Sequence, residues 1–219
     1  MKKVYRYRSG YWRKIRHRYV NEKPSSEQLE EALGFITATL KQLQIDYALT
    51  AGTCLGIHRD GQLIQNDDDI DIDLLNYEYK QKIRLLISCL VLKKIVFRLG
   101  ESYAYPKISM FYKGVKISLV SQMIETEKNI LTREKYCVPF NYLFPSRKTK
   151  WKGYIINLPN ETVKYLEHVY GTNWKKPEQW KTGDKYNMAY IRKRTKKSLG
   201  SKILNKIKSM INSNCRNYL

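Results

Sequence analysis

Residues 69–74 alternate acidic and aliphatic side chains, and this alternation constrains the fold more than any other feature of the chain. The acidic positions are Asp69, Asp71 and Asp73, and the aliphatic positions are Ile70, Ile72 and Leu74. A period of two is typical of a strand with one buried face and one open face. The pattern therefore predicts a strand, running from Leu63 to Leu75, that presents its carboxylates on one side of a sheet.

Carboxylates on one face of a strand lie about 7 Å apart along the chain. They repel one another unless a cation lies between them. Magnesium prefers one or two carboxylates together with substrate phosphates. The sequence therefore predicts a site for Mg²⁺ or Mn²⁺ with Asp69 and Asp71 as ligands and Asp67 or Asp73 as further candidates. The alternatives are a solvated acidic edge and a calcium loop, but an EF-hand would need a glycine at its sixth position, which is absent here.

A glycine followed by a threonine, Gly52-Thr53, precedes Asp69 by 16 residues. We expect a tight turn here, with Thr53 capping a short helix that ends near Arg59. Backbone N–H groups and the positive dipole end at a helix start suit a phosphate. The pair is therefore a candidate phosphate site beside a candidate metal site.

The remaining patterns predict a mixed α+β domain. Helical spacing and a capping box at Ser25 and Gln28 predict a helix that ends near Gln44. The further predictions are strands over 45–50 and 95–99, a helix over 77–92, a hairpin of 102–112 with 115–120, an irregular region over 121–150, and a helix over 161–170 between Asn160 and Gly171.

Positive charge is concentrated at the two ends of the chain. The formal net charge is +21; residues 1–20 hold eight basic and no acidic side chains, and residues 181–219 hold eleven basic and one acidic. We therefore divide the chain into a basic aromatic arm (1–23), a catalytic domain (24–180) and a basic tail with an amphipathic helix (181–219). Such charge favours polyanionic partners, including an anionic membrane surface or nucleic acid.

Several motifs follow one another in order along the chain: Leu49-Thr50-Ala51-Gly52-Thr53-Cys54-Leu55-Gly56-Ile57-His58-Arg59, Gly61, Ile64, Asp67-Asp68-Asp69-Ile70-Asp71-Ile72, Tyr105 to Lys107, Leu158-Pro159, Tyr165-Leu166, Tyr170-Gly171, Trp174 and Pro177. This order resembles the signature of the LicD/fukutin family of phosphotransferases. It implies a nucleotidyltransferase-like fold: a mixed sheet flanked by helices, here with basic extensions. By position it implies a metal on Asp69 and Asp71, a donor phosphate at Gly52 and Thr53, and phosphate or substrate contacts from Arg59 and Lys107.

The same resemblance implies an enzyme that moves a phospho-alcohol, such as phosphocholine or ribitol phosphate. The donor would be CDP-linked, and the acceptor a cell-surface glycan or its lipid-linked precursor, as in modification of lipopolysaccharide, teichoic acid or capsule. The expected location is the cytoplasm, peripheral on the inner face of the membrane. Nucleic acid is the less favoured partner.

Two positions depart from the family pattern. Gln65-Asn66 stands where the family often has Pro-Trp, and Ser118 stands where it usually has an aspartate that completes the metal site. Either Asp67, Asp73, Glu101 or a water takes the place of the missing aspartate as a metal ligand, or metal affinity is low, or the protein is inactive. Two alternatives therefore stay open: a nucleotidyltransferase acting on a small molecule or RNA, and a non-catalytic binding module of the same fold.

Overall fold

The structure is a computed structural model that describes residues 23–64, 67, 69–102, 105–133 and 136–177. The predicted arm (apart from Lys23), the predicted basic tail with its amphipathic helix, and Asp68 lie outside these residues. The three-part division of the chain stays a prediction. No helix in the described ranges is both long and apolar enough to cross a membrane.

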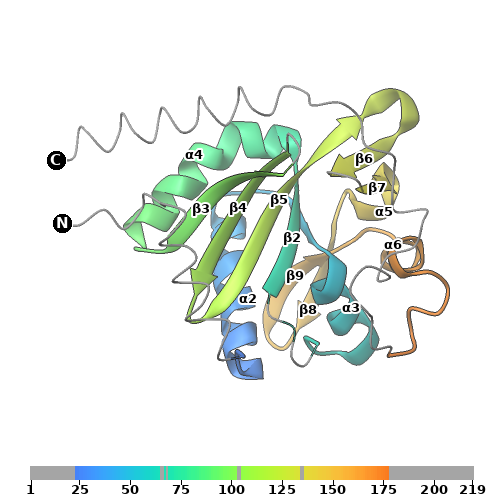
Figure 1. Cartoon of the computed structure of the whole chain (residues 1–219), viewed down its shortest axis with the longest axis horizontal. Helices are drawn as coiled ribbons and strands as arrows, with labels where there is room; N and C mark the ends of the chain where they lie inside the picture. The colour runs from blue at the N-terminus through green and yellow to red at the C-terminus, as the bar shows by residue number, and fades with distance from the viewer. Residues whose placement is uncertain (1–22, 65–66, 68, 103–104, 134–135, 178–219) are drawn as a thin grey trace.

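Helices cover a central sheet (Figure 1). The helical elements are α2 (Ser26–Gln42), α3 (Ala51–Asp60), α4 (Asn76–Leu92), η1 (Thr126–Lys128), α5 (Phe140–Leu143) and α6 (Thr162–Tyr170). The predicted capping box is confirmed at the start of α2. The Ser25 backbone N–H donates to Gln28 Oε1 over 2.8 Å, and the Gln28 N–H donates to Ser25 Oγ over 3.2 Å.

The central sheet mixes parallel and antiparallel strands. Its strands are β1 (Tyr47–Leu49), β2 (Asp69–Leu75), β3 (Val96–Ser102), β4 (Tyr105–Tyr112), β5 (Val115–Glu125), β6 (Ile130–Arg133) and β7 (Tyr136–Pro139). The main order is β1-β2-β5-β4-β3, with β6 and β7 continuing from β5. Only β2 and β5 pair in parallel among the described strands. A separate hairpin joins β8 (Arg147–Trp151) to β9 (Tyr154–Leu158).

The two faces of the sheet have different chemistry. Ile70, Ile72 and Leu74 of β2 are at most 1% exposed and belong to the main hydrophobic core. Helices α2 and α4 contact β5, and α4 also contacts β2; in Figure 1 the sheet lies in front of α2. The alternating acidic positions therefore lie on the other face. The predicted α+β class, with a mixed sheet flanked by helices, is confirmed.

Several predicted boundaries are wrong for identifiable reasons. The acidic strand begins at Asp69 rather than Leu63, because pairing with β5 begins there. The region 121–150, predicted to be irregular, holds the end of β5, the hairpin of β6 and β7, and two short helices. These strands are four residues long, too short to show a period. The residue before α6 is Glu161 rather than Asn160, whereas Gly171 ends the helix as predicted.

Candidate active site

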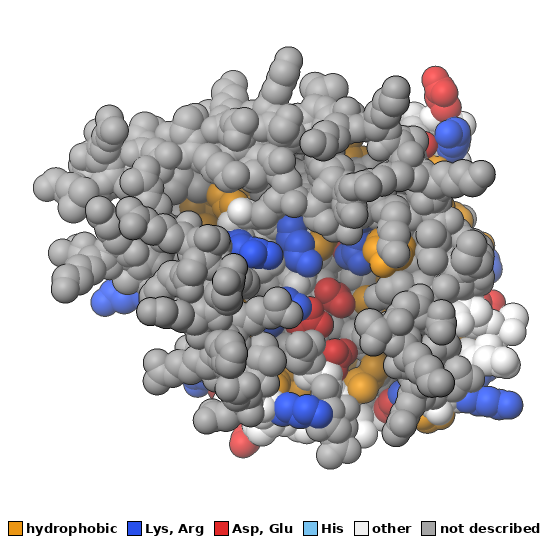
Figure 2. Space-filling model, viewed as in Figure 1, with side chains coloured by type: hydrophobic (Ala, Val, Ile, Leu, Met, Phe, Trp, Pro, Cys, Tyr) orange, Lys and Arg blue, Asp and Glu red, His pale blue; other side chains and the backbone are white. Residues whose placement is uncertain are grey.

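Strand register gathers charged side chains on the open face of the sheet. In β2 and β5, Asp69 pairs with Lys116, and Asp71 pairs with Ser118. Directly paired residues of neighbouring strands point to the same side. Figure 2 shows this arrangement of charge: acidic side chains lie near the centre of the visible face, with Lys and Arg side chains beside them. The acidic strand is thus adjacent to cations.

Asp73 is the most deeply buried of the three alternating carboxylates, at 1% exposure. Its Oδ1 accepts a hydrogen bond from Arg133 Nη1 over 2.7 Å, and its Oδ2 accepts one from Gln122 Nε2 over 2.7 Å. Both oxygens are therefore engaged by protein donors. This arrangement makes Asp73 a structural anchor between β2, β5 and β6 rather than a ligand directed at an open site.

Asp69 and Asp71 are only partly buried, in contrast to Asp73. Asp69 Oδ2 accepts a hydrogen bond from Lys116 Nζ in an ion pair. Burial, followed by the negative charge of Asp69, raises the pKa of Asp71 from 3.8 to about 7; Arg133 opposes the rise, while Asp73 and Asp67 add to it. Asp71 therefore carries negative charge that the surrounding protein does not fully balance.

The start of α3 is joined to the acidic strand by hydrogen bonds. Thr53 Oγ1 accepts a hydrogen bond from the Asp71 backbone N–H over 2.9 Å, and the Thr50 N–H donates to the Asp71 carbonyl over 3.0 Å. A Cβ added at Gly52 would overlap with Asp67 Oδ2. The first turn of α3 and the carboxylates of β2 therefore form one site.

The predicted turn at Gly52-Thr53 is wrong in detail. The two residues lie inside the first turn of α3, because the helix begins at Ala51 after the N-cap Thr50. The change of direction occurs at Ala51, whose φ of 49° lies in the left-handed region. The Ala51 N–H donates to the hydroxyl of Tyr165 in α6 over 3.0 Å. Tyr165 thereby supports the backbone that precedes Gly52 and Thr53.

Comparison with known families identifies the domain. Residues 44–161, more than half of the chain, match the LicD/FKTN/FKRP nucleotidyltransferase domain. The chain belongs to this family. The match includes α3, β2 and β5, the elements that form the site.

Three curated relatives are ribitol-5-phosphate transferases named FKTN. The human and Macaca fascicularis proteins are each 30% identical over 158 residues, and the Mus musculus protein is 29% identical over 161 residues. The matches cover 68–69% of this chain and 33–34% of the relatives. The chain thus spans about a third of the length of the relatives that it matches.

Two solved structures of ANT(2″)-Ia are distant matches. The crystal structure with adenylyl-2″-tobramycin has 12% identity and a TM-score of 0.42, and covers 62% of this chain and 70% of that chain. The solution structure of this antibiotic-resistance factor has 14% identity and a TM-score of 0.42, and covers 83% of this chain and 89% of that chain. This likeness is too distant to bear on function.

Of the other site residues expected for the LicD family, Lys107 lies on the acidic face and Arg59 lies at the far end of α3. Lys107 pairs with Val120, which pairs with Asp73, so Lys107 stands two strands from the acidic strand. Arg59 donates to both carboxylate oxygens of Asp60, over 2.8 and 2.7 Å. About 10 Å of helix axis separates it from Gly52. The structure therefore does not bring Arg59 together with the carboxylates.

Ser118 stands beside Asp71, at the position where the family usually has an aspartate. It is fully buried, and its hydroxyl has no hydrogen-bond partner among the described residues. A hydroxyl adds no charge to the site. The departure expected from the sequence is therefore located next to the carboxylate with the raised pKa.

The chemistry of the site fits a divalent cation held by two protein carboxylates. No group of three or more His, Cys, Asp or Glu side chains that could hold a metal occurs in the described part of the chain. Mg²⁺ does not need such a group, since one or two carboxylates with phosphates and water complete its coordination. The incompletely balanced charge on Asp71 is the kind that a cation neutralises.

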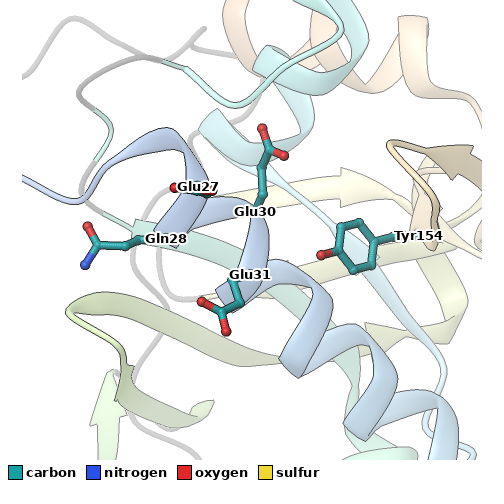
Figure 3. Close-up of a pocket in the computed structure, with 5 residues that line it drawn as sticks. All are labelled: Glu27, Gln28, Glu30, Glu31 and Tyr154. Atoms are coloured by element: carbon teal, nitrogen blue, oxygen red, sulfur yellow. The ribbon is translucent and has the colours of Figure 1, made fainter.

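A shallow acidic pocket at the start of α2 is unrelated to this site. It measures about 330 Å³, and its lining residues are Glu27, Gln28, Glu30, Glu31 and Tyr154. Figure 3 shows Tyr154 of β9 across from the acidic side chains of α2. Glu30 pairs with Lys152 and Glu31 pairs with Lys113. These two carboxylates already have cationic partners, and α2 contacts the sheet from the side opposite the acidic face.

Sequence reasoning assigned no role at the site to four residues that shape it: Lys116, Gln122, Arg133 and Tyr165. Lys116 had a usable signal, because it lies two positions before Ser118 in a predicted strand and so shares its face. Tyr165 belongs to a motif that carries the family resemblance, but its contact with Ala51 has no local signal, and Gln122 and Arg133 had no signal at all. Gln122, Arg133 and Tyr165 make their contacts with residues 49, 60 and 114 positions away.

Proposed function

We propose that this chain is a metal-dependent transferase that moves a phospho-alcohol from a CDP-linked donor to a glycan or its lipid-linked precursor. One observation carries the proposal: the hydrogen bond from the Asp71 backbone N–H to Thr53 Oγ1 joins the start of α3, the candidate phosphate site, to a pair of carboxylates. The names of the FKTN relatives support ribitol phosphate as the transferred group. Phosphocholine is the alternative that the family resemblance leaves open.

Each residue of the site has a role in this proposal. Asp69 and Asp71 would hold Mg²⁺ or Mn²⁺, and the ion would supply positive charge to the phosphates of the donor. The first-turn backbone N–H groups of Gly52 and Thr53 point a positive helix end at a donor phosphate. Asp71 accepts a hydrogen bond from the acceptor hydroxyl, and Lys107 contributes positive charge on the same face.

The expected place of action is the cytoplasmic side of a membrane. This expectation rests on the concentration of basic residues in the terminal segments. Each Lys or Arg near an anionic membrane surface contributes about 1 kcal/mol to binding. Binding to vesicles that contain anionic lipid, compared with neutral vesicles, would measure this property separately from catalysis.

Two labelled donors test the reaction class. With the polyol of a CDP-polyol labelled, we expect label in the glycan product; with the base of CTP labelled, we expect none. Removing divalent metal with a chelator, or changing both Asp69 and Asp71 to alanine, should stop the transfer. Label from the base in the product would instead support a nucleotidyltransferase. Unchanged transfer by the double variant would contradict the mechanism.

A non-catalytic module is the second candidate, and the neutral Ser118 beside Asp71 favours it. Titration calorimetry with CDP, with and without Mg²⁺, separates binding from turnover. Metal-dependent CDP binding without transfer to any glycan acceptor would support the module. Metal-dependent binding together with transfer would support the enzyme.

Replacing Gly52 with alanine should weaken nucleotide binding without destabilising the fold. The added methyl would displace the Asp67 carboxylate, which is the flexible end of a side chain, and alanine is favoured over glycine in a helix by about 0.5–1 kcal/mol. We expect the Kd for CDP with Mg²⁺ to rise about tenfold, corresponding to about 1.4 kcal/mol, and Tm to be unchanged or slightly higher.

Gly56→Ala is the matched control in the same helix. Its added Cβ would lie 2.7 Å from the Gln62 carbonyl oxygen and 2.7 Å from the Ile64 backbone nitrogen, and backbone atoms cannot move aside as a carboxylate can. Crowding of this kind costs typically 1–3 kcal/mol, so Gly56→Ala should lower Tm. If Gly52→Ala lowered Tm as much as Gly56→Ala does, the assignment of Gly52 to nucleotide binding rather than to stability would be contradicted.

A further inference from the structure

The ion pair between Lys116 and Asp69 places a permanent cation inside the candidate metal site. Lys116 lies on β5 directly beside Asp69 on β2, and Nζ contacts Asp69 Oδ2. The Lys116 side chain is 31% exposed and that of Asp69 is 18% exposed. Partly buried charges are screened by solvent and salt less than exposed ones. The pair therefore contributes to the potential of the site under ordinary ionic strength.

The β5 side of the site contributes no negative charge, because Lys116 is cationic and Ser118 is neutral. Ser118, the next residue on the same face, is fully buried, and its hydroxyl has no hydrogen-bond partner among the described residues. The register pairs Asp69–Lys116 and Asp71–Ser118 together carry one negative charge. Asp73 is balanced by Arg133, and Asp67 adds one further negative charge near Asp71. A site that binds two divalent ions holds them about 3.5–4 Å apart and needs enough anionic ligands to offset their mutual repulsion.

We infer that Lys116 acts as a built-in cation at Asp69, so that this site accepts a single divalent ion, held mainly by Asp71, when a nucleotide is bound. The inference rests on the proposed function and specifies how its metal site is completed. Lys116 balances Asp69 and stands where it can also contact an anionic donor group. It is a positioning residue for the metal and for the charge of the donor.

Counting bound Mn²⁺ tests this inference without an activity assay. The full chain is titrated with Mn²⁺ at saturating CDP, and unbound Mn²⁺ is measured by electron paramagnetic resonance. We expect one Mn²⁺ per wild-type chain, two per Lys116→Met chain, and one per Lys116→Arg chain, since arginine keeps the cation. Two ions on the wild-type chain, or one on the methionine variant, would overturn the inference.

Lys128→Met is the matched control, because it removes the same charge and an ion pair, 3.5 Å from Glu125, on an exposed turn. It should bind one Mn²⁺, as the wild type does. No Mn²⁺ binding by the wild-type chain with CDP would refute the proposed function itself, whereas two bound ions would refute only the role of Lys116. If the methionine variant does not fold, Lys116→Gln takes its place, with two Mn²⁺ expected and one overturning the inference.

Discussion

Changing Asp71 to asparagine should abolish transfer and, in the absence of metal, raise thermal stability above about pH 7. In the proposed mechanism Asp71 holds the metal ion, and its loss would remove several kcal/mol of charge stabilisation, which corresponds to about a thousand-fold in rate. The stability effect has the opposite sign because the folded protein holds a proton on Asp71 more tightly than the unfolded chain does. Activity and stability are thus expected to change in opposite directions.

The pH dependence of this variant follows from the raised pKa of Asp71. The pKa rises from 3.8 to about 7, chiefly through burial and then through the charge of Asp69. Near pH 4 the folded protein carries Asp71 protonated and no cost arises. Between about pH 4 and 7 the unfolded chain has released this proton while the folded protein still holds it, so the wild type loses stability as pH rises. Above about pH 7 the loss is complete and is on the order of a few kcal/mol, since one pKa unit corresponds to about 1.4 kcal/mol.

Thermal unfolding in a chelator at pH 5 and pH 8 measures this effect. We expect Asp71→Asn to exceed the wild type in Tm at pH 8 and to approach it at pH 5, while Mg²⁺ with CDP should raise the Tm of the wild type alone. Asp60→Asn is the control of opposite sign, because the Arg59 hydrogen bond lowers the pKa of Asp60. The Tm of Asp60→Asn at pH 8 should be no higher than that of the wild type. Equal Tm values for Asp71→Asn and wild type at pH 8 would contradict the electrostatic account.

Changing Arg133 to methionine should destabilise the fold by about 3–5 kcal/mol, the usual cost of removing one partner from a buried ion pair. The Arg133 side chain is 11% exposed and that of Asp73 is 1% exposed. Without the guanidinium, Asp73 Oδ1 would lose the hydrogen bond from Arg133, and the buried carboxyl group would keep the hydrogen bond from Gln122 to Oδ2. Chemical denaturation at pH 7 would measure the loss.

Two further variants separate the buried charge from lost packing. Adding Asp73→Asn to Arg133→Met should recover part of the stability, because the uncompensated charge is removed. Lys152→Met breaks the ion pair with Glu30, whose side chains are 41% and 26% exposed, and should cost at most about 1 kcal/mol. A loss for Arg133→Met no greater than that for Lys152→Met would show that Asp73 does not depend on its partner.

The sequence predicted the parts of this protein whose signals are local. The alternation of Asp69–Leu74 depends only on the two-residue period of a strand, and it identified the open face that the structure confirms. The capping box at Ser25 and Gln28 needs residues three positions apart, and it too is confirmed. The family resemblance placed Ser118 at the candidate metal site, and the register sets it beside Asp71.

The start of α3 shows where local reasoning failed. The sequence predicted that Thr53 caps the helix, as its side chain could do in an isolated peptide. In the folded protein the Thr53 hydroxyl instead accepts from the Asp71 backbone, and Ala51 adopts φ of 49° beside the Tyr165 hydroxyl. Tertiary hydrogen bonds override the local capping preference here.

The sequence by itself determined that three carboxylates share one face of a strand and that a candidate phosphate site precedes them, because both follow from spacing along the chain. Only the tertiary structure decided how those carboxylates differ. Asp73 is paired with Arg133, Asp69 with Lys116, and Asp71 carries the raised pKa. The physical reason is that charge balance depends on distance in space, and the balancing cations lie 47 and 60 residues away in the sequence.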